Sequence, residues 1–226
     1  MKCGVLGTGT VGRVIGSRLA ELGHEVTIGT RDVDTLLAGT EPDAMGNEPF
    51  ASWRGKHPEI GLGTFAVAAA ASELIVNATN GAGSLEALRA AGEKSLDGKV
   101  LIDIANPLDF SGGMPPSLSV SNTDSLGEQI QRAFPDVRVV KALNTMNAFV
   151  MADPSLVAGG EHTVFVSGND EQAKAQVTEI LRSFGWKDVI DLGDITTARG
   201  TEMYLPLWLR SWGALGTGTF NISVAR

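Results

Sequence analysis

The chain has 226 residues, of which 43% are hydrophobic and 19% are charged, so it is long enough and apolar enough to fold as one generous domain or two small ones. Its 26 acidic and 18 basic residues give a net charge of −8, which repels the phosphates of nucleic acids. We therefore expect no nucleic-acid partner.

The cysteine and histidine content and the lack of a long apolar run exclude several further classes of protein. The single cysteine, Cys3, excludes a disulfide framework, is interpreted as a buried apolar side chain, and fits a reducing cytoplasm. The three histidines, His24, His57 and His162, are scattered and predict no metal site. No signal peptide and no run of about 18 apolar residues is evident. We expect a cytoplasmic protein that does not contact membranes.

Strand-like and helical stretches alternate along the chain, which predicts an α/β fold with a doubly wound, Rossmann-type parallel sheet. The expected strands, in chain order, are residues 2–6, 25–29, 60–65, 73–78, 99–104, 138–142, 163–167, 188–192 and 219–224. A change of character near Asn144 predicts a dinucleotide-binding domain over 1–143 and a smaller α/β extension over 144–226 on the same sheet.

Capping signals place the helices between these strands. Apolar residues at helical spacing follow Thr10 and stop at Gly23, Ser125 begins a helix over 126–134, and Asp170 begins one that ends near Phe184. A short helix is expected at 50–56. The long connections 39–63 and 107–123, rich in Gly, Pro, Ser and Asn, are of the kind that covers ligands in open α/β sheets.

The first strand is followed by the motif Gly7-x-Gly9-x-x-Gly12, which opens a helix. In this context Gly7 makes the turn, Gly9 lets a pyrophosphate approach the backbone, and Gly12 permits close packing of the helix on the sheet. The free N–H groups at the helix start, around Thr10 and Val11, attract the anion. The motif predicts a dinucleotide site.

The end of the second strand bears on which dinucleotide binds. NAD-binding folds usually place an acid there, whereas this strand ends in Thr30 and Arg31, a hydroxyl and a guanidinium suited to a 2′-phosphate. The pattern favours NADP(H). Two alternatives stay open: Asp32 binds the ribose of NAD if the strand is longer, or Arg31 is simply a solvated surface charge.

Polar side chains follow three further strands, in the stretches 77–81, 104–108 and 143–147. The carboxyl ends of parallel strands form the ligand side of such sheets, so we expect these loops to wall a second part of the site, although ordinary turns use the same residues. A Tyr/Lys proton relay is absent because the only tyrosine is Tyr204 and position 208 is Trp208. Hydride transfer between stacked rings needs positioning and no relay.

Four stretches carry a family resemblance: "GTGTVGRVIGSRLAELGHEVTIGTR", "VVKALNT", "VFVSGND" and "LGDITTARGTEMYLPL". With them the chain resembles the NADP-dependent oxidoreductases of the coenzyme F420 reductase family. The last three also look like the cytosolic reductase domain of the STEAP metalloreductases, which pass hydride from NADPH to a flavin. The resemblance implies an extended Rossmann sheet, a homodimer, and coenzyme F420 or FAD/FMN as the co-substrate.

The resemblance and the glycine motif together assign site residues. Those expected to bind NADP(H) are Gly7, Thr8, Gly9, Thr10, Val11, Gly12, Thr30, Arg31, Thr79, Asn80 and Asn106. The residues expected near the nicotinamide and acceptor rings are Asn106, Pro107, Asn144 and Thr145. The principal hypothesis is an NADPH-dependent reductase of a deazaflavin or flavin. The alternative is a non-catalytic NADP(H)-binding sensor or partner protein.

The segment 203–215, "MYLPLWLRSWGAL", has two tryptophans and several leucines spread too evenly for a one-sided helix. It is expected either to be buried in the core or to contact a second chain and close the acceptor pocket. Pro206 is expected to kink the helix.

Overall fold

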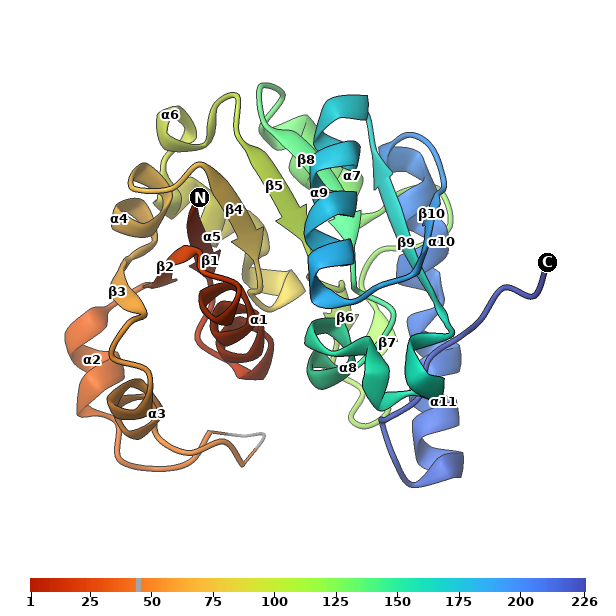
Figure 1. The fold of residues 1–226 in the computed structure, drawn as a ribbon, viewed down its shortest axis with the longest axis horizontal. Helices are drawn as coiled ribbons and strands as arrows, with labels where there is room; N and C mark the ends of the chain where they lie inside the picture. The colour runs from red at the N-terminus through yellow and green to blue at the C-terminus, as the bar shows by residue number, and fades with distance from the viewer. Residues whose placement is uncertain (44–45) are drawn as a thin grey trace.

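The computed structural model describes residues 1–43 and 46–226, so residues 44–45 of the predicted connection 39–63 lie outside the described part. An eight-stranded sheet runs through the molecule in the order β10-β9-β8-β5-β4-β1-β2-β3 (Figure 1). Its strands are β1 (Lys2–Leu6), β2 (Glu25–Thr30), β3 (Gly61–Thr64), β4 (Leu74–Asn77), β5 (Val100–Asp103), β8 (Arg138–Ala142), β9 (Thr163–Gly168) and β10 (Asp188–Asp191). The Rossmann-type fold predicted from the alternation of elements is confirmed.

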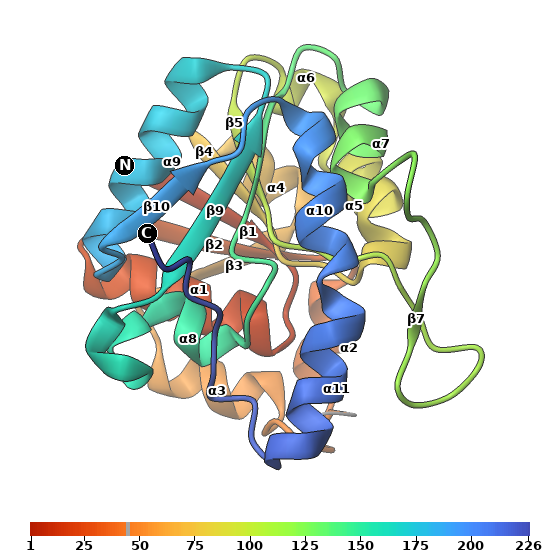
Figure 2. The ribbon, with the colours of Figure 1, turned by 90° about the vertical axis from the view of Figure 1, so that its right-hand side faces the viewer.

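Helices cover both faces of the sheet (Figures 1 and 2). They are α1 (Thr10–Glu21), α2 (Val33–Ala38), α3 (Phe50–Lys56), α4 (Phe65–Ala70), α5 (Ser84–Ala91), α6 (Glu93–Leu96), α7 (Leu126–Ala133), α8 (Ala148–Ala152), α9 (Glu171–Phe184), α10 (Ala198–Met203) and α11 (Leu205–Leu215). The predicted caps are present, because Ser125 accepts a hydrogen bond from the Glu128 N–H and Asp170 accepts one from the Ala173 N–H. The connection 107–123 holds a hairpin of β6 (Leu108–Asp109) and β7 (Ser117–Leu118).

Two apolar cores form, one on each face, because strand residues alternate between the faces. One core joins Val5, on β1, to Ile15 of α1 and Val177 of α9. The other joins Leu6, the next residue of β1, to Leu88 of α5. Cys3 lies in the first core, and burial raises the pKa of its thiol to about 11, so it behaves as the apolar side chain that was expected.

The strand direction changes once. β8 pairs with β9 in the antiparallel direction, whereas the other six pairs of neighbouring strands in the large sheet are parallel. A parallel neighbour needs a long crossover, usually a helix that returns along the sheet. The chain between β8 and β9 has only α8 and two 3-10 turns, and α8 packs against α1 instead. The sheet is therefore mostly, not wholly, parallel.

The ninth expected strand, 219–224, is wrong. These residues have no strand ladder. At the start of β9 the Thr163 N–H donates to the Ile222 carbonyl at 3.1 Å and the Val224 N–H donates to the Thr163 hydroxyl at 3.0 Å, and the Phe220 ring stacks on Trp208 of α11. A full ladder is impossible there because both edges of β9 are already occupied by β8 and β10. Sequence alternation alone does not show which edges are free.

The segment 203–215 is not buried on most sides. Within it only Leu205 and Trp208 are buried, while Leu207 and Leu215 are about 60% exposed (61% and 60%), so the expectation of core burial is wrong. The helix is interrupted at Tyr204, and Pro206 lies in the first turn of α11, where its missing N–H costs little. The contact with a second chain remains a prediction.

Candidate functional site

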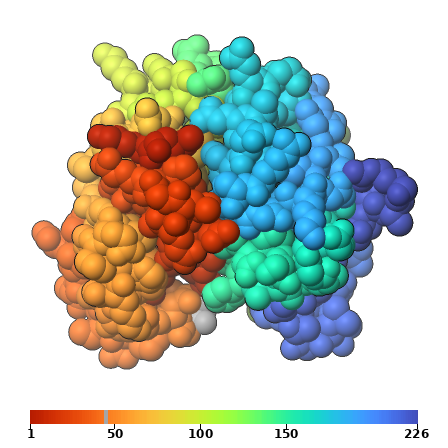
Figure 3. Space-filling model, viewed as in Figure 1, coloured from red at the N-terminus to blue at the C-terminus, as the bar shows by residue number. Residues whose placement is uncertain are grey.

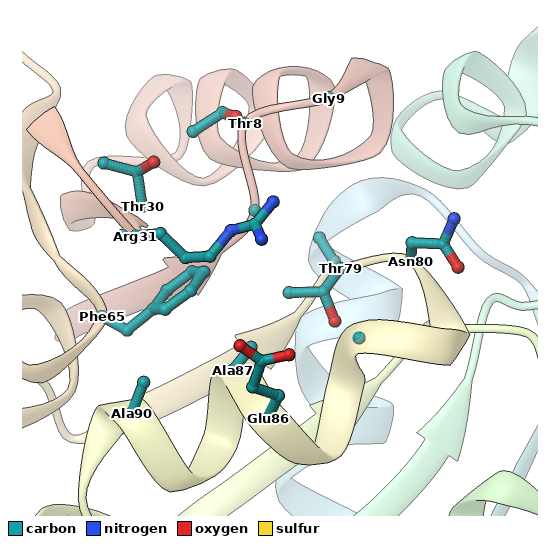
Figure 4. A pocket seen from close by; sticks show the side chains of 14 residues that line it. Thr8, Gly9, Thr30, Arg31, Phe65, Thr79, Asn80, Glu86, Ala87 and Ala90 are labelled. Atoms are coloured by element: carbon teal, nitrogen blue, oxygen red, sulfur yellow. The ribbon is translucent and has the colours of Figure 1, made fainter. Parts of the chain in front are cut away.

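A cavity of about 370 Å³ opens at the carboxyl ends of β1 and β4, where the strand order of the sheet reverses (Figure 4). We call it the glycine-loop cavity. Its lining comes from the glycine loop, the end of β2, the start of α4, the turn after β4 and one side of α5: Gly7, Thr8, Gly9, Gly29, Thr30, Arg31, Phe65, Ala78, Thr79, Asn80, Gly83, Glu86, Ala87 and Ala90. Seven of the residues expected to bind the nucleotide are in this set.

The three glycines of the motif differ in what surrounds them. Gly7 has a φ of +124°, and a Cβ there would lie 2.4 Å from the Ala78 carbonyl oxygen. A Cβ on Gly12 would lie 2.1 Å from the Gly7 carbonyl oxygen. A Cβ on Gly9 would meet nothing within 4 Å, because Gly9 faces the open cavity. Gly7 and Gly12 are thus needed for the fold, and Gly9 leaves space for a ligand.

The N-terminus of α1 is free to bind an anion. Gly9 is its N-cap, no side chain caps the helix, and its first turn has no acidic residue. The unpaired N–H groups and the helix dipole together attract negative charge. This end of the cavity therefore fits the pyrophosphate of a dinucleotide.

Thr10, Val11 and Gly12 do not line the cavity itself. Their contribution is the backbone of the first turn of α1, and the Thr10 hydroxyl is bound by the Asn47 amide at 2.7 Å. Thr10 and Asn47 line a second cavity of about 640 Å³ between α1, α3 and α8, where the surface is hollowed in Figure 3. The helix α1 separates the two spaces.

At the end of β2 the structure distinguishes three polar side chains. Thr30 is nearly buried and lines the cavity, and Arg31 follows it with no ion pair or hydrogen bond to any described residue. Asp32 is outside the cavity lining and caps α2, because its carboxylate accepts a hydrogen bond from the Thr35 N–H at 2.9 Å. This bond lowers the pKa of Asp32. The carboxylate that was the alternative ribose ligand is thus engaged elsewhere.

Arg13 was not singled out from the sequence. Its guanidinium donates to the Thr8 carbonyl at 2.8 Å and the Glu48 carbonyl at 2.6 Å, and it lies over the rings of Phe50 and Trp53. Burial lowers its pKa. Arg13 therefore holds the glycine loop against the connection 46–49. An arginine one residue after the last glycine of the motif is the only sequence signal for this role.

The loops after β4, β5 and β8 converge, as expected from their place at one edge of the sheet. Gly81 makes the approach possible, since a Cβ there would lie 2.0 Å from the Asn106 carbonyl oxygen. The Asn106 amide donates to the Asn144 carbonyl at 2.8 Å, and the Asn144 amide donates to the Asn106 side-chain oxygen at 3.0 Å. We call these two residues the amide pair. Pro107 and Thr145, the residues that follow the amide pair in the sequence, are both buried.

Other polar residues of these loops serve the turns themselves. Asn147 caps α8 by accepting from the Val150 N–H, and Asn80 accepts from the Ala82 N–H. Asn77 is fully buried and bridges Asp103 at 2.8 Å and Ser84 at 3.1 Å. The turn interpretation is therefore correct for Asn147 and for part of the role of Asn80.

A buried lysine cluster lies beneath the loops after β5 and β8. Lys141 contacts the carboxylates of Asp103 at 2.9 Å and Glu202 at 2.8 Å, and also donates to the Ala105 carbonyl. All three charged side chains are buried, and Glu202 also accepts from the first two N–H groups of α7. Burial lowers the pKa of Lys141, but the two carboxylates outweigh it and the pKa is raised. The cluster fixes the backbone that carries Asn106.

The backbone after β8 is strained. Leu143 has a φ of +63°, a left-handed conformation that is costly for a branched side chain. Such strain is held only where the surroundings determine the conformation, and it is frequent at functional sites. Leu143 precedes Asn144 of the amide pair.

Comparison with known proteins agrees with this geometry. Residues 2–107 match the family described as "NADP oxidoreductase coenzyme F420-dependent". The crystal structure of a candidate F420-dependent NADP reductase from Arthrobacter sp. FB24 is 63% identical, with a TM-score of 0.97 over the whole of both chains. The chain belongs to this family. It is thus a member of an NADP-dependent oxidoreductase family, as the resemblance predicted.

Two curated relatives are more distant, and the matched part covers about half or less of each. Metalloreductase STEAP3 of Rattus norvegicus is 26% identical over 212 residues, which are 93% of this chain and 38% of that protein. The F420-dependent NADP reductase of Methanocaldococcus jannaschii is 28% identical over 116 residues, 51% of each chain. The chain spans about half or less of the length of these relatives.

Among the described residues, no helix is long and apolar enough to cross a membrane. Within the same residues no group of His, Cys, Asp and Glu side chains is arranged to hold a metal ion.

Proposed function

We propose that this protein transfers a hydride between NADPH and a flat aromatic acceptor, a deazaflavin such as coenzyme F420 or a flavin, FMN or FAD. The observation that carries the proposal is the continuity of one edge of the sheet. The glycine-loop cavity at β1 and β4 adjoins the amide pair at β5 and β8, and Gly81 and Asn106 are in close approach where the two meet. A nucleotide and a second ring thus find neighbouring places.

The residues of the cavity fit NADP(H). Gly9 leaves room for the pyrophosphate beside the uncapped start of α1, formed by Thr10, Val11 and Gly12. Thr30 and Arg31 offer a hydroxyl and an unpaired guanidinium to a 2′-phosphate, and a guanidinium binds phosphate in a bidentate manner. Gly7, Thr8, Thr79 and Asn80 also line the cavity.

The loops after β5 and β8 position the rings. When bound, NADPH supplies the hydride from its nicotinamide ring, so the protein needs to hold two rings in contact and exclude water. Asn106 and Asn144 fix each other at the rim, and Pro107 and Thr145 add buried, rigid backbone beside them. The strained Leu143 and the buried lysine cluster keep this rim in one conformation.

A second chain is part of the proposal. The exposed leucines Leu207 and Leu215 and the partly exposed Trp212 form an apolar strip on α11, which runs along the outside of the molecule (Figure 2). We infer that α11 contacts a second copy near the acceptor end. The dimer should sediment at roughly twice 23.6 kDa, and Trp212→Ala should shift it toward monomer, whereas the exposed Leu37→Ala should not. A wild-type monomer at micromolar concentration would contradict this.

The test of the function is an anaerobic absorbance assay with NADPH and, in separate reactions, F420, FMN or FAD. Consumption of NADPH in proportion to protein concentration with one of them supports the proposal and names the acceptor. Tight binding of NADPH with no transfer to any acceptor would support the alternative, a non-catalytic NADP(H)-binding sensor or partner protein. The amide pair is compatible with this alternative, because Asn106 and Asn144 already hydrogen-bond to each other. We expect the reaction to occur in the cytoplasm, which the single buried cysteine fits.

A further inference from the structure

The outer end of the glycine-loop cavity differs from its inner end. The inner end is backbone of the glycine loop, whereas the outer end is walled by the Phe65 ring and the methyl groups of Ala87 and Ala90. Apolar walls of this kind suit a flat heteroaromatic ring. Two charged side chains border this end, Arg31 from β2 and Glu86 from α5, and Figure 4 shows both extending toward the cavity.

The carboxylate of Glu86 is uncommitted. It forms no hydrogen bond or ion pair with any residue that the structure describes, and it lines the cavity from the first turn of α5. By contrast, Asp32, the other acid near this end, is occupied in capping α2. An ionised carboxylate offers only acceptors, so a ligand group that it binds must be a donor.

A purely structural role for Glu86 is to complement the helix dipole of α5, whose N-cap, Gly83, provides no side-chain cap. That role requires a negative charge in the first turn but no particular direction of the side chain. Glu86 is an exposed residue, but the dipole would be served equally well by a carboxylate directed away from the cavity. It therefore does not account for a carboxylate in the cavity lining.

We propose that Glu86 accepts a hydrogen bond from the exocyclic amino group of adenine and so selects adenine over purines that carry an oxygen at that position. The inference rests on the proposed NADP(H) site but not on the identity of the acceptor. With the pyrophosphate at α1 and the 2′-phosphate at Thr30 and Arg31, the apolar outer end is the place left for the base. There the amino group is a donor, and an oxo group would face the carboxylate with like polarity.

The test compares the dissociation constants of NADPH and of its hypoxanthine analogue, in which an oxygen replaces the amino group. The wild-type protein should prefer NADPH by about tenfold or more, the size expected for a hydrogen bond to a charged group. Glu86→Ala should reduce the preference to about twofold by weakening NADPH. Glu86→Gln should improve binding of the analogue, because a carboxamide also donates.

Glu93 provides the matched control, since it is an exposed acid in the first turn of α6 and does not line the cavity. Glu93→Ala removes the same charge and should leave the preference unchanged. An unaltered preference in Glu86→Ala would overturn the inference. So would equal tightening of both ligands, which would mean that Glu86 acts only by repelling phosphate. Failure of the wild-type protein to bind NADPH at all would instead overturn the proposed function and this inference with it.

Discussion

The two ends of the proposed site lie on the same edge of the sheet but are built in opposite ways. In the glycine-loop cavity the groups that would meet a ligand are uncommitted: the start of α1 has no side-chain cap, and Arg31 and Glu86 have no partner among the described residues. At β5 and β8 the polar groups bind each other, as the amide pair, above a cluster of buried charges. The glycine-loop cavity, which we call the open end, leaves its polar groups free for a ligand. The loops after β5 and β8 with the amide pair, which we call the fixed end, hold theirs in a fixed geometry.

The largest expected effect tests the fixed end. Lys141→Met leaves the carboxylates of Asp103 and Glu202 buried without a counterion, which should lower the free energy of unfolding by about 3–5 kcal/mol. Urea denaturation measures it. Lys187→Met is the control, because its ion pair with Glu161 is exposed and should contribute about 1 kcal/mol or less. Equal losses in the two variants would show that the cluster does not support this end.

The next effect tests the open end. Gly9→Val should weaken NADPH binding at least about 100-fold, because the side chain fills the space for the pyrophosphate, while the fold persists since a Cβ there meets nothing within 4 Å. Isothermal titration calorimetry measures the NADPH affinity, and circular dichroism shows whether the variant is folded. Gly12→Val, by contrast, should fail to fold normally, because its Cβ would collide with the Gly7 carbonyl. Retained affinity in a folded Gly9→Val would refute the role of the loop.

A smaller effect sharpens the assignment of the cofactor. Arg31→Ala should remove most of the preference for NADPH over NADH, about 10- to 100-fold, since a charge-assisted contact to phosphate contributes roughly 1.5–3 kcal/mol. Stability should change little, because Arg31 is exposed and forms no hydrogen bond or ion pair with the described residues. Arg89→Ala, an exposed arginine on α5 outside the cavity, is the control. Equal dissociation constants of NADPH and NADH in the unmutated protein would contradict the assignment.

The smallest effect separates the two ends. Asn144→Ala breaks one bond of the amide pair and should slow hydride transfer by about tenfold through loss of ring positioning. The dissociation constant of NADPH should change less than about twofold, since Asn144 lies outside the glycine-loop cavity. Turnover and binding are measured on the same sample. A loss of NADPH affinity with normal turnover of bound cofactor would mean that Asn144 belongs to the open end.

The open end was predictable from the sequence because its signals are local. The three glycines, the helix start at Thr10 and the pair Thr30 and Arg31 lie within one strand-helix-strand unit, and spacing alone places them together. Spacing could not decide whether Arg31 or Asp32 faces the cofactor, because the answer depends on whether the Asp32 carboxylate caps α2.

The fixed end was predictable only in outline. Strand ends placed Asn106 and Asn144 on one edge, but their mutual hydrogen bonds join residues 38 positions apart, and no local pattern encodes that contact. The sequence shows Glu86 only as an acidic residue in the first turn of a helix, so its place in the cavity lining could not be predicted. The direction of β9, and the lack of the strand expected at 219–224, depend on which edges of the sheet are free. That is a property of the assembled fold.

The most direct test of the central claim is a single-turnover reaction with NADPH deuterated at the hydride-donating carbon and a deazaflavin as the acceptor. A deazaflavin accepts the hydride on carbon, so the label does not exchange with water as it would on a flavin nitrogen. Direct transfer between positioned rings predicts deuterium in the reduced deazaflavin and a slower rate with the labelled cofactor. Reduced acceptor without the label, or no reduction by protein that binds both molecules, would contradict it.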